Sequence, residues 1–215
     1  TDASIMMKPG EEATSDESTM ILAAMLPTAL HPKAKLVANI GLGSALTSAT
    51  FLDNPRIQNL DTIEIEKGMI EAANGFRPRV ELVYSDPRSR IYNEDAKTFF
   101  STYNKKYDLI VSEPSNPWVS GVAGLFSKEF YRLIRHHLDN DGMLVQWIHL
   151  YEIDINLVVS VLKAVSSNFS DYEVYAANNW DMIVVAKKTG RLPPFDMNVF
   201  NHPALAADLH RIHVD

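Results

Sequence analysis

The stretch "KLVANIGLGSALTSATFL", residues 35–52, joins an apolar run to a helix-like segment through two glycines. The run "KLVANI" (35–40) has the length and composition of a buried strand, and "SALTSATFL" is typical of a helix. Gly41 and Gly43 allow a sharp turn and a close approach to a ligand, with the helix N-terminus aimed at the same place. We expect a ligand site at this turn, although glycines at this spacing also serve helix–strand packing.

The same alternation of apolar runs and helix-like stretches continues along the chain. The further runs are "LDTIEIE" (60–66), "VELVYS" (80–85), "YDLIVS" (107–112) and "GMLVQWIHL" (142–150). "DYEVYAA" and "WDMIVVAKK" flank "NN" and predict a terminal hairpin whose last strand runs antiparallel to the rest. The pattern predicts an α/β fold with a mostly parallel, doubly wound sheet. We expect residues 1–30 to lead into the fold, 31–190 to form a nucleotide-binding domain, and 191–215 to form a tail.

Composition excludes several classes of function. The chain has 215 residues, is 46% hydrophobic and carries a net charge of −7, which argues against a nucleic-acid partner. It contains no cysteine, so disulfides, zinc–thiolate sites and thiol catalysis are excluded. His210 and His213 lack a third ligand, and we expect no metal site. The run "MILAAMLPTAL" (20–30) is too short to span a membrane.

Acidic residues follow the apolar runs at the places where a nucleoside would need them. Glu64 lies about 20 residues beyond the glycine turn, where one carboxylate can grip both ribose hydroxyls, and Glu66 is its rival for that role. Asp95 lies at a strand-to-helix junction, either as a helix N-cap or as the acceptor of an adenine amino group, with Ala96 presenting its backbone N–H. The glycine pattern stops at GxG, so we expect an adenosyl ligand without a pyrophosphate.

The loop "SEPSNPW" (112–118) follows the fourth run. Glu113 should emerge at the mouth of the same cleft, and two prolines stiffen the loop after it. Beside a cationic sulfonium ligand, this carboxylate can act on an incoming nucleophile or hold an ammonium group. The alternative is a loop that is only structural, in which Trp118 simply packs.

The order of "IGLGSA", "IEIE", "NEDA", "YDLIVSEPSNPWVSGVAGLFSKEFY" and "GMLVQW" resembles the spermidine synthase (polyamine aminopropyltransferase) family, in particular its bacterial spermidine-synthase-like branch. The resemblance implies a Rossmann-like class I methyltransferase fold. It also implies transfer of an aminopropyl group from decarboxylated S-adenosylmethionine to an amine, with release of methylthioadenosine. The residues implied to bind the nucleoside are Gly41, Gly43, Ser44, Glu64, Asp95 and Ala96.

The resemblance places Glu113 at the catalytic aspartate of that family and Asn116 at a second aspartate that binds the amine. Trp118 joins Asn116 as a candidate contact of the amine substrate. Three positions depart from the family pattern. Ser44 stands where an aspartate usually pairs with the aminopropyl ammonium, Asn116 is neutral, and "TMILA" replaces a Tyr-Gln/His-Glu segment. The amine pocket is therefore expected to differ from that of the family members that use putrescine.

Two other functions stay open. One is methyl transfer from S-adenosylmethionine on the same fold. The other is a non-catalytic domain that binds an adenosyl ligand within a larger membrane-associated protein. The chain opens at Thr1 without a methionine, as expected of a processed or excised piece. We expect a cytoplasmic location, free or as the soluble part of a membrane-fused parent, and the sequence leaves open whether it forms a homodimer.

Overall fold

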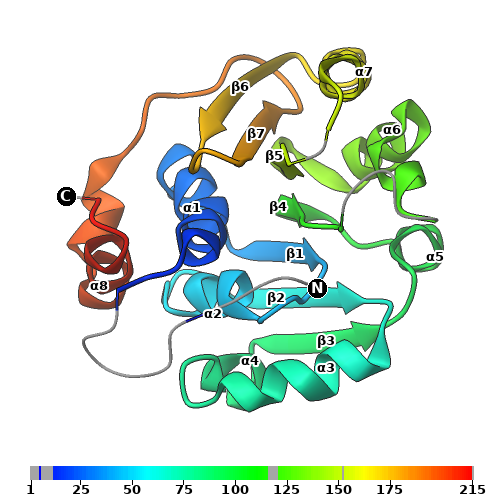
Figure 1. The fold of residues 1–215 in the computed structure, drawn as a ribbon. Helices are drawn as coiled ribbons and strands as arrows, with labels where there is room; N and C mark the ends of the chain where they lie inside the picture. The colour runs from blue at the N-terminus through cyan, green and yellow to red at the C-terminus, as the bar shows by residue number, and fades with distance from the viewer. Residues whose placement is uncertain (1–4, 6–11, 116–120, 152, 215) are drawn as a thin grey trace.

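The computed structural model describes residues 5, 12–115, 121–151 and 153–214, and in this part a seven-stranded sheet forms the centre (Figure 1). The strand order is β3-β2-β1-β4-β5-β7-β6. The strands are β1 (Leu36–Ile40), β2 (Asn59–Glu64), β3 (Ser89–Asn93), β4 (Tyr107–Ser112), β5 (Leu138–His149), β6 (Asp171–Ala176) and β7 (Asp181–Lys187).

The sheet is parallel from β3 to β5, and among the described strands β7 runs opposite to the others, while β6 beyond it points in the same direction as β5. Strand β1 pairs in parallel with both β2 and β4, whereas β7 is antiparallel to both β5 and β6. The chain winds outward from β1 to β3 and then returns to place β4 on the other side of β1, so strand order reverses between β1 and β4. This confirms the predicted doubly wound sheet and its antiparallel hairpin. The reversal point is where such a sheet leaves room for a ligand.

Helices cover both faces of the sheet (Figure 1). The elements are α1 (Ser15–Leu30), α2 (Leu46–Leu52), α3 (Lys67–Ala73), η1 (Asn74–Phe76), α4 (Glu81–Ser85), α5 (Ala96–Thr102), η2 (Ala123–Phe126), α6 (Lys128–His137), α7 (Ile155–Ser166), η3 (Met197–Asn201) and α8 (Pro203–Arg211). Residues of α1, α2, α4 and α8 share one buried cluster with the sheet, and residues of α5, α6 and α7 share the other.

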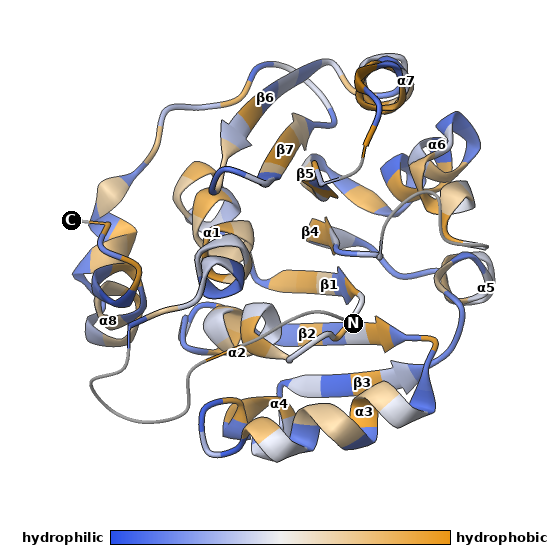
Figure 2. Cartoon of the chain, viewed as in Figure 1, coloured by the Kyte–Doolittle hydropathy of each residue, from blue (hydrophilic) through white to orange (hydrophobic). Residues whose placement is uncertain are grey.

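Alternate side chains of the central strands pack into these two clusters. In β4, Leu109 and Val111 face the α1/α2 side, while Ile110 faces the α5/α6 side. Strands β1 and β7 are accordingly mostly hydrophobic, and β3 at the sheet edge is mostly hydrophilic (Figure 2). In the part of the chain that the structure describes, no helix is both long and apolar enough to cross a membrane.

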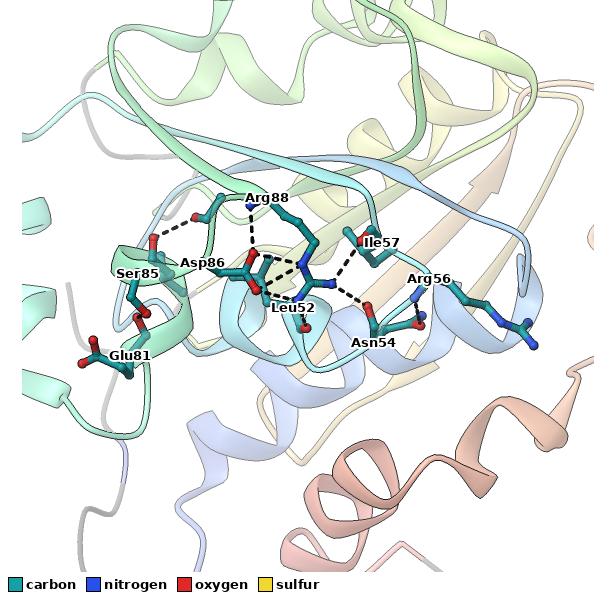
Figure 3. Close-up of polar contacts among 10 residues, drawn as sticks. Leu52, Asn54, Arg56, Ile57, Glu81, Ser85, Asp86 and Arg88 are labelled. Carbon is teal, nitrogen blue, oxygen red and sulfur yellow. Dashed lines mark hydrogen bonds and ion pairs between the residues drawn. The ribbon is translucent and has the colours of Figure 1, made fainter.

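The predicted strand at 80–85 is wrong: "ELVYS" forms helix α4, and the third strand begins only at Ser89. Val80 and Val83 are both buried in the cluster on the α1/α2 side, and residues three apart share a face in a helix but not in a strand. Ser85 Oγ donates to the carbonyl of Glu81 (2.9 Å), a contact of helical spacing (Figure 3).

Arg88 fixes where the third strand starts (Figure 3). Its guanidinium pairs with Asp86 (2.6 Å) and donates to the carbonyls of Leu52, Asn54 and Ile57. These bonds attach the turn after α4 to the end of α2. Pairing with β2 begins at this point, because the Leu60 N–H donates to the Arg88 carbonyl (2.9 Å) and Leu60 is in register with Ser89.

Helix α1 connects the tail to the rest of the fold. Glu17 in its first turn is fully buried, and Arg211 of α8 donates to its carboxylate through Nε (2.6 Å). Arg79 lies 3.3 Å from the same carboxylate. A buried charge paired on two sides is costly to break. The ion pairs therefore hold α8 against the N-terminal end of α1.

Candidate active site

The glycine turn after β1 lies between the ends of β2 and β4. The Gly41 N–H donates to the carbonyl of Ile63 (2.9 Å), and the Glu113 N–H donates to the carbonyl of Ile40 (2.8 Å). Gly41 has φ +93°, and a Cβ there would lie 2.5 Å from the backbone oxygen of Glu113. Gly43 has φ +51°. The predicted turn thus exists, and it brings the first strand end against Glu113.

Glu64 lies at the end of β2 beneath this turn. Its Oε2 accepts from the Leu42 N–H (2.9 Å) and its Oε1 accepts from the Glu66 N–H (2.8 Å). Its exposed fraction is 8%, whereas Glu66 is exposed. The carboxylate therefore ties the turn to β2, and each oxygen keeps a further lone pair for a hydroxyl donor. Its contact with a ribose stays a prediction.

Ser44 and Asp95 have clear local roles. Ser44 is buried, and its Oγ donates to Sδ of Met20 (3.0 Å) in α1. Asp95 caps α5, because its Oδ1 accepts from the Thr98 N–H (2.9 Å), and Ala96 follows it as the first helical residue. The N-cap interpretation of Asp95 is thus observed. The contacts of Ser44, Asp95 and Ala96 with a ligand stay predictions.

Glu113 lies directly after β4, with its side chain on the α1/α2 side of the sheet. Its Oε2 accepts from the hydroxyl of Thr47 in α2 (2.9 Å). Burial raises its pKa from an ordinary 4.5 to about 7, although interactions with Thr47 and Asn39 lower it. A carboxyl group with a pKa near 7 can exchange a proton at neutral pH. Asn116 and Trp118 lie outside the described residues.

Sequence reasoning missed Thr47, Asn39 and a polar cluster around Asp181. Thr47 and Asn39 lie inside segments interpreted as core, and only their contacts distinguish them. Asp181 opens β7 beside the end of β5, where Trp147 and His149 alternate with apolar residues. Two polar side chains alternating at the end of a buried strand are the signal that could have indicated this cluster.

No group of three or more His, Asp or Glu side chains within the described ranges is arranged to hold a metal ion.

Comparison with known protein families matches residues 17–182 to the spermine/spermidine synthase domain. A polyamine aminopropyltransferase of Alkaliphilus oremlandii is 37% identical over 120 residues, which cover 56% of this chain and 42% of the relative. That of Caldicellulosiruptor saccharolyticus is 26% identical over 203 residues, covering 86% of this chain and 73% of the relative. The chain spans about half the length of the first curated relatives that it matches, 42% to 54%.

Solved structures share the fold. A spermidine synthase in complex with the transition state analogue AdoDATO has a TM-score of 0.78 at 19% identity, covering 93% of this chain and 76% of that one. Human methyltransferase-like protein 13 in complex with SAH has a TM-score of 0.64 at 18% identity, covering 91% of both chains. The predicted methyltransferase-like fold is confirmed.

Gly41→Ala should destabilise the protein by about 2 kcal/mol or more, because it places a Cβ against the Glu113 backbone at a positive φ. Urea unfolding measures the change. The matched control is Gly68→Ala in α3, where a Cβ meets nothing within 4 Å, and it should shift stability by less than about 1 kcal/mol. Equal effects from the two substitutions would contradict the close approach of the turn to Glu113.

The raised pKa of Glu113 makes the charged form unfavourable in the folded state. Between pH 4.5 and 7 the folded state holds the proton more tightly than the unfolded state, so this group's contribution to stability falls as pH rises through that window. Glu113→Gln removes this effect. The free energy of unfolding of the variant, relative to that of the unsubstituted protein, should therefore rise by about 2 kcal/mol between about pH 5 and pH 8. Urea unfolding at both pH values tests this, with Glu66→Gln as the exposed control. Parallel curves for native and Glu113→Gln would rule out the shift.

Proposed function

Because the chain belongs to the spermine/spermidine synthase family, we propose that it transfers an aminopropyl group from decarboxylated S-adenosylmethionine to an amine and releases methylthioadenosine. The observation that carries this proposal is Glu113. The backbone of Glu113 lies against the glycine turn, at the point where strand order reverses, and the pKa of its carboxyl group is raised to about 7. In the proposed reaction, the sulfonium carbon and the attacking nitrogen would meet beside it.

The donor would lie across the ends of β1, β2 and β3. Gly41 and Gly43 would let the backbone approach it, Glu64 would accept from the ribose hydroxyls, and Asp95 with Ala96 would bind the adenine. Support comes from the lone pairs left on Glu64 and from the position of Asp95 at the next strand end along the sheet. The donor is cationic, and the acidic strand ends suit its charge.

The amine would bind on the β4 side of the donor. Glu113 would accept an N–H of the amine and hold its nitrogen in line with the carbon next to the sulfonium, with Thr47 fixing the carboxyl orientation. Asn116 and Trp118 of the following loop remain proposed contacts of the amine. In the reaction the C–N bond forms, the C–S bond breaks, and the electron pair of that bond goes to sulfur, which leaves as a neutral thioether.

Ser44 favours a second candidate, methyl transfer from S-adenosylmethionine. An acid at this position would repel the α-carboxylate of that donor, and serine does not. In the structure, however, the Ser44 hydroxyl faces Met20 and would have to rotate to reach a ligand. Aminopropyl transfer is therefore the leading proposal, and the reaction product distinguishes the two.

The main test is product analysis by mass spectrometry with each donor and a panel of putrescine, longer diamines and spermidine. Methylthioadenosine supports aminopropyl transfer, S-adenosylhomocysteine indicates methyl transfer, and binding without either product indicates a non-catalytic domain. Glu113→Gln should lower turnover by roughly 100-fold or more, because it keeps the shape and removes the charge. Its affinity for methylthioadenosine should be unchanged. Full activity in this variant would leave Glu113 a structural role only.

Calorimetry with methylthioadenosine tests the ribose assignment. Glu64→Ala should weaken binding by about 1–3 kcal/mol, the scale of a charge-assisted hydrogen bond. Glu64→Gln keeps an acceptor for the turn and should have a smaller effect, which separates ribose binding from the loss of the turn. Glu66→Ala is the control, and it should bind as the native protein does. A loss of affinity in Glu66→Ala alone would assign the ribose to Glu66.

A further inference from the structure

Asp181 is the centre of a buried polar cluster that the proposed function has not used. The exposed fraction of Asp181 is 5%, and four side chains from three other segments donate to its carboxylate. The donors are Thr19 Oγ1 (2.8 Å), Asn178 Nδ2 (2.7 Å), Trp147 Nε1 (2.9 Å) and His149 Nδ1 (2.7 Å). Each carboxylate oxygen thus accepts two hydrogen bonds.

The carboxylate of Asp181 is saturated and charged. Burial alone would raise its pKa, but the hydrogen bonds from His149, Asn178, Thr19 and Trp147 lower it below the usual range. With four donors in place, no lone pair is left for a ligand. Asp181 therefore acts on the site through the side chains that it holds.

His149 is the outward-facing member of this cluster. Its Nδ1 lies 2.7 Å from a carboxylate oxygen, so in the neutral ring Nδ1 is the donor and Nε2 is the acceptor. The exposed fraction of the side chain is 27%. The rings of Trp147 and Tyr151 lie 5.9 Å and 6.0 Å from the imidazole ring. A carboxylate-held imidazole with a free nitrogen is the usual arrangement of a proton acceptor.

His149 and Glu113 lie on the same face of the sheet. Ser112 of β4 is in register with Gln146 of β5, so Glu113 continues opposite Trp147, and His149 lies two residues further. With a rise of 3.3 Å per residue and neighbouring strands 4.8 Å apart, the two Cα atoms are about 8 Å apart. The Glu113 side chain contacts Thr47 of α2, and Asp181, the partner of His149, contacts Thr19 of α1.

Helix α1 connects His149 and Glu113 through one intervening side chain on each side. Thr19 donates to Asp181 (2.8 Å), and the carbonyl of the next residue, Met20, accepts from Thr47 (3.1 Å), which also contacts Glu113. Two consecutive residues of one helix therefore contact both clusters. A molecule held by Glu113 would have His149 as its neighbour along the sheet edge.

We propose that His149, oriented by Asp181, accepts the proton that the attacking amine loses. This inference rests on the proposed function. The amine nitrogen forms its bond to the carbon next to sulfur, the C–S electron pair leaves with the thioether, and the new secondary ammonium gives one proton to Nε2. Glu113 holds the nitrogen, and Asp181 stabilises the imidazolium that forms. Here His149 is a catalytic residue and Asp181 a positioning residue.

The test compares variants with decarboxylated S-adenosylmethionine and the amine of the panel that gives the highest turnover. His149→Asn keeps a donor for Asp181 and removes the acceptor at Nε2. It should lower kcat by roughly 100-fold and leave the KM of the donor and the affinity for methylthioadenosine unchanged. His149→Ala should be partly restored by added imidazole. His136→Asn, on the exposed C-terminal turn of α6 at the opposite end of β5, is the control.

NMR of nitrogen-15-labelled histidine adds a readout that does not depend on turnover. In the native protein His149 should be in the Nδ1–H form, and Asp181→Asn should shift it toward the other tautomer and lower kcat with it. A native-like kcat in His149→Asn would overturn the proposal. So would a joint loss of kcat, ligand affinity and melting temperature without rescue by imidazole, which indicates a structural role.

Failure of the proposed function is recognised separately, from the products that the unsubstituted protein releases. If the native protein releases neither methylthioadenosine nor S-adenosylhomocysteine, both proposals are wrong. If it releases S-adenosylhomocysteine, aminopropyl transfer is wrong, and the same variants decide the fate of the amine proton with S-adenosylmethionine as donor.

Discussion

The backbone of Gly41 lies so close to the carbonyl of Glu113 that there is no room for a side chain between them. This contact joins the ends of β1 and β4 at the point where strand order reverses. It fixes the glycine turn and Glu113 relative to each other through main-chain atoms. Under the proposed function, the sheet itself sets the distance between the donor and acceptor sites, and the Thr47 hydroxyl orients the carboxyl group of Glu113.

Helix α1 is the second element on which the site depends. Its first turns contact Asp181 through Thr19 and Thr47 through Met20, so the helix covers the strand ends of β4, β5 and β7 together. The buried pair of Glu17 with Arg211 holds the same turns from the far side. The C-terminal helix α8, remote in sequence, therefore holds helix α1 in place over the candidate site. Breaking that ion pair should therefore first displace Thr19 and Met20, the nearby residues of α1 that contact Asp181 and Thr47.

The sequence predicted what local pattern determines and missed what distant pairing determines. The segment at 35–52 was predictable because an apolar run, two glycines and a helix leave little choice. "VELVYS" was not, because its apolar residues suit either a strand or a helix, and the contacts of Arg88 with Leu52, Asn54 and Ile57 decide between them. The pair of His149 and Asp181 joins residues on antiparallel strands, and the alternation of Trp147 and His149 at the end of β5 indicates only one side of it.

The electrostatics of Glu113 give the site an order of events under the proposed function. At a pKa of about 7, a large share of the protein carries this carboxyl group protonated at neutral pH, and a neutral acid attracts an ammonium only weakly. A sulfonium cation bound beside it would lower that pKa and release the proton. The donor therefore charges Glu113, and the charged carboxylate then draws the amine into place. Since Glu113 is by then the counter-ion of two cations, the proton that the nitrogen loses is better taken by a second base, and the imidazole of His149 lies next along the sheet edge.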